Sequence, residues 1–194
     1  TNYNHLEKEI KNSNPQIIIH LAAQALVSDS YKNPYKTVET NVMGTLNVIE
    51  ASKKLKNLKS LLIITSDKCY LNKEIKKGYK EIDQLGGDDP YSASKASAEN
   101  IFNAYAKSFF CNQNQYGYAT ARAGNVIGGG DWSKDRLIPD CIKSIIKKNK
   151  LMIRNPNSTR PWQHVLEPIS GYLLLAKLLY ERKKKYSGNW NFGP

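Results

Sequence analysis

The sequence predicts an α/β fold with a doubly wound parallel sheet. Three short apolar runs, at residues 17–22, 61–65 and 118–121, have the composition of buried strands, and the last continues toward Val126. Segments with the apolar spacing of helices lie between and after these runs. The order strand, helix, strand, helix, strand is typical of right-handed crossovers between parallel strands, so these observations together predict this fold class.

The helices are predicted from apolar residues three or four positions apart. Residues 1–15 have the pattern of the end of a helix, and residues 37–55 form a second one. The clearest helix spans residues 91–109, with Asp89 as its N-cap and Pro90 at its first position. Two more helices are expected at residues 138–146 and 169–179, with a short strand at residues 151–154 between them.

The position of the glycines suggests how the chain divides. A dinucleotide-binding fold normally has a glycine-rich, phosphate-binding turn after its first strand, and none precedes residue 17. The glycines at 128–130 come late and lead into Asp131 and Trp132. We therefore expect residues 1–126 to be the C-terminal portion of a Rossmann-like domain, truncated at its N-terminus. Residues 127–194 are expected to be part of a smaller α+β substrate-binding lobe.

The net charge of +12 raises the alternative of a basic nucleic-acid-binding protein. The basic residues are spread over polar helix faces without zinc-finger spacing or an RNA-binding aromatic motif, so we expect no nucleic-acid partner. No apolar run approaches the roughly 20 residues of a membrane-spanning helix, and we expect no membrane partner. The first residues are polar, so no secretory signal is expected. Three distant Cys residues predict reduced thiols, a cytoplasmic protein and no metal site.

Two residues at the start of the clearest helix can share one site. Tyr91 and Lys95 are four positions apart and lie on the same helix face. A nearby cation is expected to lower the pKa of the Tyr91 phenol and make it a usable general base. Chance surface packing produces the same pair, but this helix follows a buried strand and a long loop, where α/β sheets place their active sites.

A second polar group follows the strand at residues 61–65. Thr65, Ser66, Asp67 and Lys68 bring hydroxyls, a carboxylate and an ammonium to the carboxyl end of that strand. An ordinary turn with an Asx-type cap explains these residues equally well when they are considered alone. Together with Tyr91 and Lys95, however, they provide a hydroxyl donor, a phenolic base and a second acid/base pair, which a structural turn does not need.

These elements resemble the catalytic elements of the extended short-chain dehydrogenase/reductase superfamily. Within its NAD-dependent sugar epimerase/dehydratase family, the chain is similar to the nucleotide-sugar 4,6-dehydratases from about residue 20 to its end. The stretches that carry this likeness are residues 66–70, 86–95, 122–132, 135–139 and 160–168. The Tyr-x-x-x-Lys pattern is common to the whole superfamily, whereas the Ser-Asp-Lys-Cys-Tyr and glycine-rich Asp-Trp segments are specific.

The resemblance implies an internal redox cycle on a sugar nucleotide, with CDP-glucose favoured. Tyr91 takes the proton of the glucose C4 hydroxyl while hydride passes from C4 to NAD, and Ser66 hydrogen-bonds the same oxygen. Lys95 keeps Tyr91 ionised and binds the nicotinamide ribose. Asp67 is the acid for the departing C6 hydroxyl, and Lys68, which must be neutral, is the base for the C5 proton. Hydride then returns to C6, giving CDP-4-keto-6-deoxyglucose.

The resemblance also implies binding residues. Those expected to line the NAD site, besides Tyr91 and Lys95, are Ala22, Ala23, Gln24 and Asn41. For Asn41, an N-cap-like role at the start of its helix is an equal alternative. The residues expected to contact the diphosphate and nucleotide are Asn125, Arg136 and Arg160, with structural salt bridges as the alternative for the two arginines. Trp162 and His164 are expected to be structural, and Glu81 receives no role.

Two other activities and one assembly state complete the expectations. A nucleotide-sugar 4-epimerase or 4-reductase of the same superfamily is the alternative activity. A 4-epimerase needs no elimination pair, so Asp67 and Lys68 argue against it. The helices that carry Tyr91 and Asn41 often form dimer surfaces in relatives, so a homodimer or higher homo-oligomer is expected for a full-length protein. Without the glycine-rich turn, the 194 residues alone are expected to bind NAD poorly and to be inactive.

Overall fold

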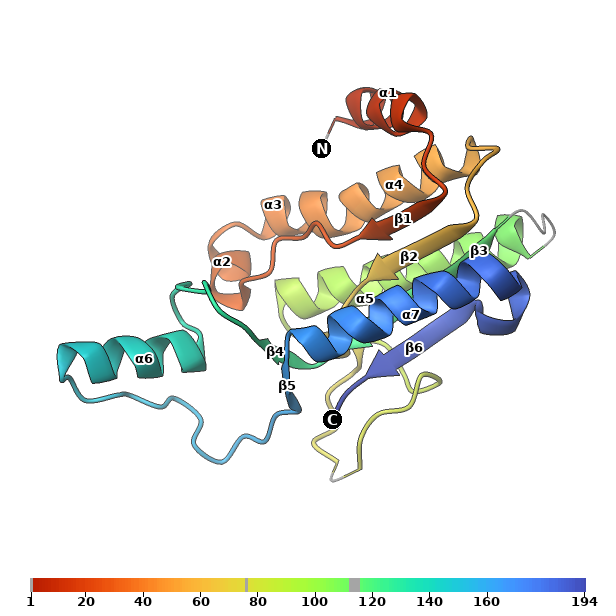
Figure 1. The fold of residues 1–194 in the computed structure, drawn as a ribbon. Coiled ribbons are helices and arrows are strands. Elements are labelled where there is room, and N and C mark those ends of the chain that lie inside the picture. Colours follow the sequence, from red (N-terminus) through yellow and green to blue (C-terminus); the bar gives the residue numbers. More distant parts are fainter. Residues whose placement is uncertain (1, 76, 112–115) are drawn as a thin grey trace.

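The computed structural model describes residues 2–75, 77–111 and 116–194, and its centre is a parallel sheet with helices on both faces (Figure 1). The sheet contains β1 (Ile17–His20), β2 (Ser60–Ile64), β3 (Gly117–Ala123) and β6 (Gly188–Phe192), in the order β1-β2-β3-β6. Every neighbouring pair is parallel. The predicted fold class is therefore confirmed.

The side chains of β2 alternate between two apolar cores. Leu61 and Ile63 pack with residues of α4 (Gly44–Lys53) and α5 (Pro90–Tyr105) on one face of the sheet. Leu62 packs on the other face with α7 (Leu166–Arg182). All three leucine and isoleucine side chains are fully buried. This alternation explains why the strand reads as a continuous apolar run, since both of its faces are covered.

The helices before β3 include those predicted from the sequence and one, α2, that was not predicted. α1 (Tyr3–Ser13) precedes β1, followed by α2 (Val27–Lys32). α3 (Pro34–Val38), the π-helical turn η1 (Glu39–Met43) and α4 together form the helix predicted at residues 37–55. α5 continues into a second π-helical turn, η3 (Ala106–Phe110). Asp89 caps α5 as predicted, because its side chain accepts hydrogen bonds from the backbone N–H groups of Tyr91 and Ser92.

The chain after β3 differs more from the predictions. β4 (Asn125–Ile127) does not continue β3 but pairs with β5 (Trp162–His164) in a second, two-stranded sheet. α6 (Leu137–Lys147) confirms the helix predicted at residues 138–146. The strand predicted at residues 151–154 is wrong: this segment pairs with no other strand among the described residues, and its Met152 is 88% exposed.

The main sheet extends past the boundary expected at residue 126. α7 packs on its face, the short 3-10 helix η4 (Lys183–Tyr186) follows, and β6 then pairs with β3. α6 and its neighbouring loops, in contrast, lie apart from the sheet (Figure 1). Among the described residues, no helix is long and apolar enough to cross a lipid bilayer.

Candidate active site

The polar groups predicted from the sequence meet at the carboxyl end of the parallel strands. Thr65 and Ser66 follow β2, Asn125 follows β3 after one glycine, and α5 begins at the same end of the sheet. The Ser66 hydroxyl, which donates to Asp67 Oδ1 at 3.1 Å, also acts on the Tyr91 phenol, so the end of β2 lies beside the first turn of α5. The topology therefore brings these residues together, as parallel sheets do at their carboxyl edge.

Burial dominates the electrostatics of Tyr91. The side chain is 8% exposed, and this desolvation raises the pKa of its phenol above the ordinary value of 10. The interaction with the Ser66 hydroxyl and the charge of Arg136 lower the pKa of the phenol, but by less than burial raises it. The prediction that Lys95 lowers the pKa of the Tyr91 phenol below its ordinary value is wrong. Lys95 Nζ lies 5.9 Å from the centroid of the Tyr91 ring, and its charge does not outweigh the desolvation of the phenol.

Lys95 is also buried, at 6% exposure. Burial lowers the pKa of its ammonium group to about 8, while the neighbouring Glu99 and Cys69 act in the opposite direction. A lysine with this pKa still carries its charge at neutral pH. The helix thus presents a buried phenol and a buried ammonium four residues apart.

The residues after β2 form a short turn that also carries an ion pair. Asp67 to Cys69 make a 3-10 turn, η2 (Asp67–Cys69), and Ser66 caps it by accepting a hydrogen bond from the Lys68 backbone N–H at 3.3 Å. Lys68 Nζ donates to Asp67 Oδ1 and to Asn125 Oδ1, at 3.3 Å each. The alternative of a capped turn is therefore correct for the backbone, while the side chains of Asp67 and Lys68 remain one third exposed.

The segment after β1 provides a small, open surface beside these residues. Ala22 is exposed and Ala23 and Gln24 are partly exposed. Asn41 holds this backbone, because its amide accepts from Gln24 N at 2.8 Å and donates to Gln24 O at 3.1 Å. The same amide donates to Ser94 Oγ in α5 at 2.9 Å. Asn41 lies inside the π-helical turn η1, so the N-cap alternative for this residue is wrong.

The two predicted arginines differ in position. Arg136 donates to Asp131 Oδ2 at 2.9 Å and to the Ala25 carbonyl at 3.5 Å, and its charge acts on Tyr91. Arg160 is exposed and donates to its neighbour Thr159, so the structure does not bring it to the other site residues. Trp162 and His164 belong to β5, and His164 Nδ1 accepts from the N–H of Leu166 at the start of α7.

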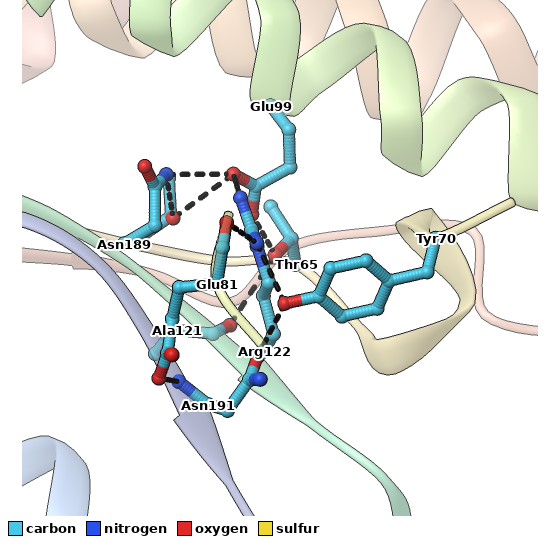
Figure 2. A network of polar contacts seen from close by, with 9 residues as sticks. Thr65, Tyr70, Glu81, Glu99, Ala121, Arg122, Asn189 and Asn191 are labelled. Carbon is cyan, nitrogen blue, oxygen red and sulfur yellow. Dashed lines mark hydrogen bonds and ion pairs between the residues drawn. The ribbon is translucent and has the colours of Figure 1, made fainter. Parts of the chain in front are cut away.

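Sequence reasoning missed a buried polar network behind the site (Figure 2). Glu99 in α5 forms an ion pair with Arg122 in β3 at 2.7 Å, and the two side chains are 0% and 1% exposed. Thr65 also donates to Glu99, as do Thr120 at 3.0 Å and Asn189 at 2.9 Å. A charged residue at a buried helix position and an arginine inside an apolar strand were the signals that could have predicted this pair.

The same arginine anchors the long loop that connects η2 to α5. Arg122 donates to Tyr70 Oη at 2.7 Å and to the Glu81 carbonyl at 3.0 Å. The Glu81 carboxylate accepts from the Asn191 backbone N–H at 2.9 Å, and Tyr70 donates to the Asn191 side chain (Figure 2). Glu81, which has no role from sequence alone, therefore fixes this loop to β6.

A close approach of two backbones fixes the start of the Tyr91 helix. A Cβ atom at Gly87 would lie 2.5 Å from the Ser92 carbonyl carbon and 2.6 Å from the Ala93 nitrogen. We expect Gly87→Ala to lower the free energy of unfolding by about 1–3 kcal/mol, because backbone must move to admit the methyl group. Gly129→Ala is the matched control, since nothing lies within 4 Å of its added Cβ. Urea unfolding gives the free energy of unfolding of each variant. Equal values for Gly87→Ala and Gly129→Ala would contradict the expectation.

The partly buried imidazole of His20, at the end of β1, should make the stability of the fold depend on pH. Burial and, to a lesser extent, the charge of Lys95 lower the pKa of its imidazole from 6.5 to about 4. The unfolded chain takes up this proton below pH 6.5 but the folded chain does not until about pH 4. Stability is therefore lost as pH falls through this window, by about 1.4 kcal/mol per pH unit from this group. Urea unfolding at several pH values should show a shallower loss for His20→Gln; an identical loss would contradict the prediction.

Solved structures place this fold among enzymes that act on sugar nucleotides. The chain matches dTDP-glucose 4,6-dehydratase from Bacillus anthracis, solved in complex with NAD, with a TM-score of 0.76 and 27% identity over 99% of this chain and 56% of that one. It matches UDP-glucose 4-epimerase from Thermotoga maritima, solved with UDP-glucose, with a TM-score of 0.83 and 20% identity, over 99% of this chain and 60% of that one. The second likeness concerns the fold alone.

The family follows from the sequence comparison. The family model described as GDP-mannose 4,6 dehydratase matches residues 1–186, and the chain belongs to that family. It is 52% identical to CDP-glucose 4,6-dehydratase from Salmonella typhimurium over 97% of this chain and 54% of that protein. The chain thus spans about half the length of this relative. The resemblance inferred from the motifs is confirmed.

Proposed function

We propose that this chain carries the catalytic residues of a nucleotide-sugar 4,6-dehydratase, with CDP-glucose as substrate and NAD as cofactor. The observation that carries the proposal is the meeting of Ser66, Tyr91 and Lys95 with the Asp67–Lys68 pair at one end of the sheet. The 52% identity to a CDP-glucose 4,6-dehydratase supports the reaction and the nucleotide.

The residues beside this set fit a dinucleotide. Gln24 Oε1 is buried and has no hydrogen-bond partner among the described residues, so it is an acceptor available to a ligand. Small side chains at Ala22 and Ala23 allow a ligand to approach the backbone, which Asn41 holds in place. When bound, NAD supplies a hydride acceptor that is regenerated within each turnover.

The first half of the proposed reaction uses the helix and the end of β2. Tyr91, as the base, removes the proton of the glucose C4 hydroxyl when C4 is oxidised, and Ser66 donates a hydrogen bond to the same oxygen. Lys95 supports the phenolate of Tyr91 with its buried positive charge and contributes to the ribose site. Because burial raises the pKa of Tyr91, these two partners are needed to stabilise its ionised form.

The second half removes water across C5 and C6. The pair acts after the proton that Lys68 donates to Asp67 has passed to the carboxylate, which leaves both groups neutral. Asp67 then gives this proton to the departing C6 hydroxyl, and Lys68 accepts the C5 proton, which the neighbouring 4-ketone makes acidic. Lys68 lies between Asp67 and Asn125, so both groups of the elimination pair are held at the same place. We assign Asn125 and Arg136 to the diphosphate. Arg160 remains a candidate for the nucleotide from sequence alone.

The full-length protein is proposed to form a homodimer or a higher homo-oligomer. Tyr35 and Val38 of α3, a helix that packs against α5, are 82% and 45% exposed. Exposed apolar side chains of this kind are common at interfaces between subunits. Sedimentation velocity with Val38→Lys tests this: a smaller species than the parent supports the assignment, and an unchanged species contradicts it.

The test is a product assay with a chimera of the Salmonella typhimurium relative, in which this chain replaces the matching residues. Incubation with CDP-, dTDP- and UDP-glucose should give a 4-keto-6-deoxy sugar, fastest from CDP-glucose. An epimerised hexose that keeps its C6 hydroxyl would contradict the dehydratase assignment. The 194 residues alone, assayed in parallel, are expected to give no product.

A further inference from the structure

A carboxylate lies one helical turn beyond Lys95 on the buried side of α5. Glu99 follows Lys95 by four positions, so the two side chains project from the same side of the helix. Glu99 is 0% exposed and Lys95 is 6% exposed. No described residue accepts a hydrogen bond from Lys95 Nζ. The nearby carboxylate therefore stabilises an ammonium group that is otherwise poorly compensated.

The Glu99 carboxylate is fixed by donors from two strands and from the residue that follows a third. Thr65, directly after β2, donates to one oxygen. Arg122 and Thr120 from β3 and Asn189 from β6 donate to the other, at 2.7, 3.0 and 2.9 Å (Figure 2). Charge-assisted hydrogen bonds of this kind are the strong ones in proteins. Glu99 consequently connects α5 to Thr65, which follows β2 and directly precedes Ser66.

We propose that Glu99 is a positioning residue of the active site: its carboxylate fixes α5 against the end of β2 and holds Lys95 as a buried ammonium beside Tyr91. The proposal deepens the proposed function and rests on it for the chemical roles of Tyr91 and Lys95. The contacts of Glu99 do not depend on those roles.

The other groups around Lys95 do not supply a negative charge near neutral pH. Burial raises the pKa of the Cys69 thiol, in η2, to about 12, so this group is neutral. The pKa of His20, at the end of β1, is lowered to about 4, so the imidazole is neutral as well. The Tyr91 ring lies on the same helix, and the pKa of its phenol is raised. Glu99 is thus the charged group that the proposal requires.

The experiment follows the titration of Lys95 itself in the 194-residue chain. NMR of the chain with ¹³C-labelled lysine gives the midpoint of each side chain, and Lys95→Met assigns the signal. Glu99→Gln is expected to move the Lys95 midpoint to lower pH by about one pH unit or more, because a nearby opposite charge has been removed. Glu99→Asp keeps the charge and should recover most of the parent midpoint. Glu50→Gln, which removes a carboxylate that contacts Tyr105 and Lys53, is the control and should leave the midpoint unchanged.

The outcomes separate this proposal from the proposed function. An unchanged Lys95 midpoint in folded Glu99→Gln overturns the positioning role. If Glu99→Gln does not fold, the double variant Glu99→Gln/Arg122→Met removes both buried charges. The Lys95 midpoint should still move to lower pH there, but by less, because a neighbouring cation has been removed as well. In the chimera, Glu99→Gln should lower kcat for CDP-glucose more than it raises KM; an effect on KM alone also contradicts the role. A parent chimera without product refutes the proposed function but leaves the Lys95 titration as evidence about Glu99.

Discussion

Replacing Tyr91 by phenylalanine should lower the kcat of the chimera on CDP-glucose by about 100- to 10,000-fold, the usual contribution of a positioned general base. Only the phenolic oxygen is lost, and the ring remains in its buried place on α5. Ser66 loses its contact with the phenol but keeps its hydrogen bond to Asp67 Oδ1 at 3.1 Å and the cap that it forms on η2. The effect should therefore fall on the chemical step, with KM for the sugar nucleotide changed little.

Tyr116→Phe is the matched control for this experiment. Tyr116 is 5% exposed and its hydroxyl has no hydrogen-bond partner among the described residues, so the same atom is removed from a buried tyrosine of the apolar core. We expect normal kcat and unchanged or slightly higher stability for this variant. A Tyr91→Phe chimera with the activity of the Tyr116→Phe control would show that Tyr91 is not the base.

The site was predictable where local chemistry determines the structure. The α5 helix could be predicted because Asp89 and Pro90 begin it and its apolar side chains repeat at helical spacing. Ser66 and Tyr91 could be predicted to lie close together because the end of β2 and the start of α5 are both expected at the carboxyl edge of one parallel sheet. The direction of the pKa shift of Tyr91 could not be predicted. Desolvation of the phenol depends on the packing of the whole chain, and it changes the pKa more than the neighbouring groups do.

The strand β6 was missed because it has polar residues at partly buried positions. β6 has the sequence Gly-Asn-Trp-Asn-Phe, which lacks the apolar pattern of a strand. Its Asn189 side chain donates to Glu99 and Thr120, and its Asn191 donates to the Tyr79 carbonyl. Partners so distant in the sequence cannot be predicted from residue spacing. The apolar pattern therefore does not reveal a strand whose partly buried polar groups are satisfied by tertiary contacts.

The largest effect on stability is expected for Arg122→Met. Methionine fills much of the volume of arginine, but it leaves the Glu99 carboxylate buried without its cation and removes the hydrogen bonds to Tyr70 and Glu81. Breaking a buried ion pair in this way costs about 3–5 kcal/mol. Urea unfolding should show a lower midpoint with an unchanged m value. Lys36→Met, which breaks the surface pair with Glu39, should cost no more than about 1 kcal/mol.

The double variant Arg122→Met/Glu99→Gln decides whether charge or packing is responsible for that loss. Arg122 Nε is buried without a partner among the described residues, a cost that methionine removes. With residue 99 also neutral, no buried carboxylate is left without its cation, so the double variant should recover a large part of the stability lost in Arg122→Met. The recovery is incomplete because Lys95 loses the nearby charge of Glu99. The recovery measures the coupling between the two residues. A double variant as unstable as Arg122→Met would mean that the arginine acts through the loop contacts with Tyr70 and Glu81 instead of through its ion pair.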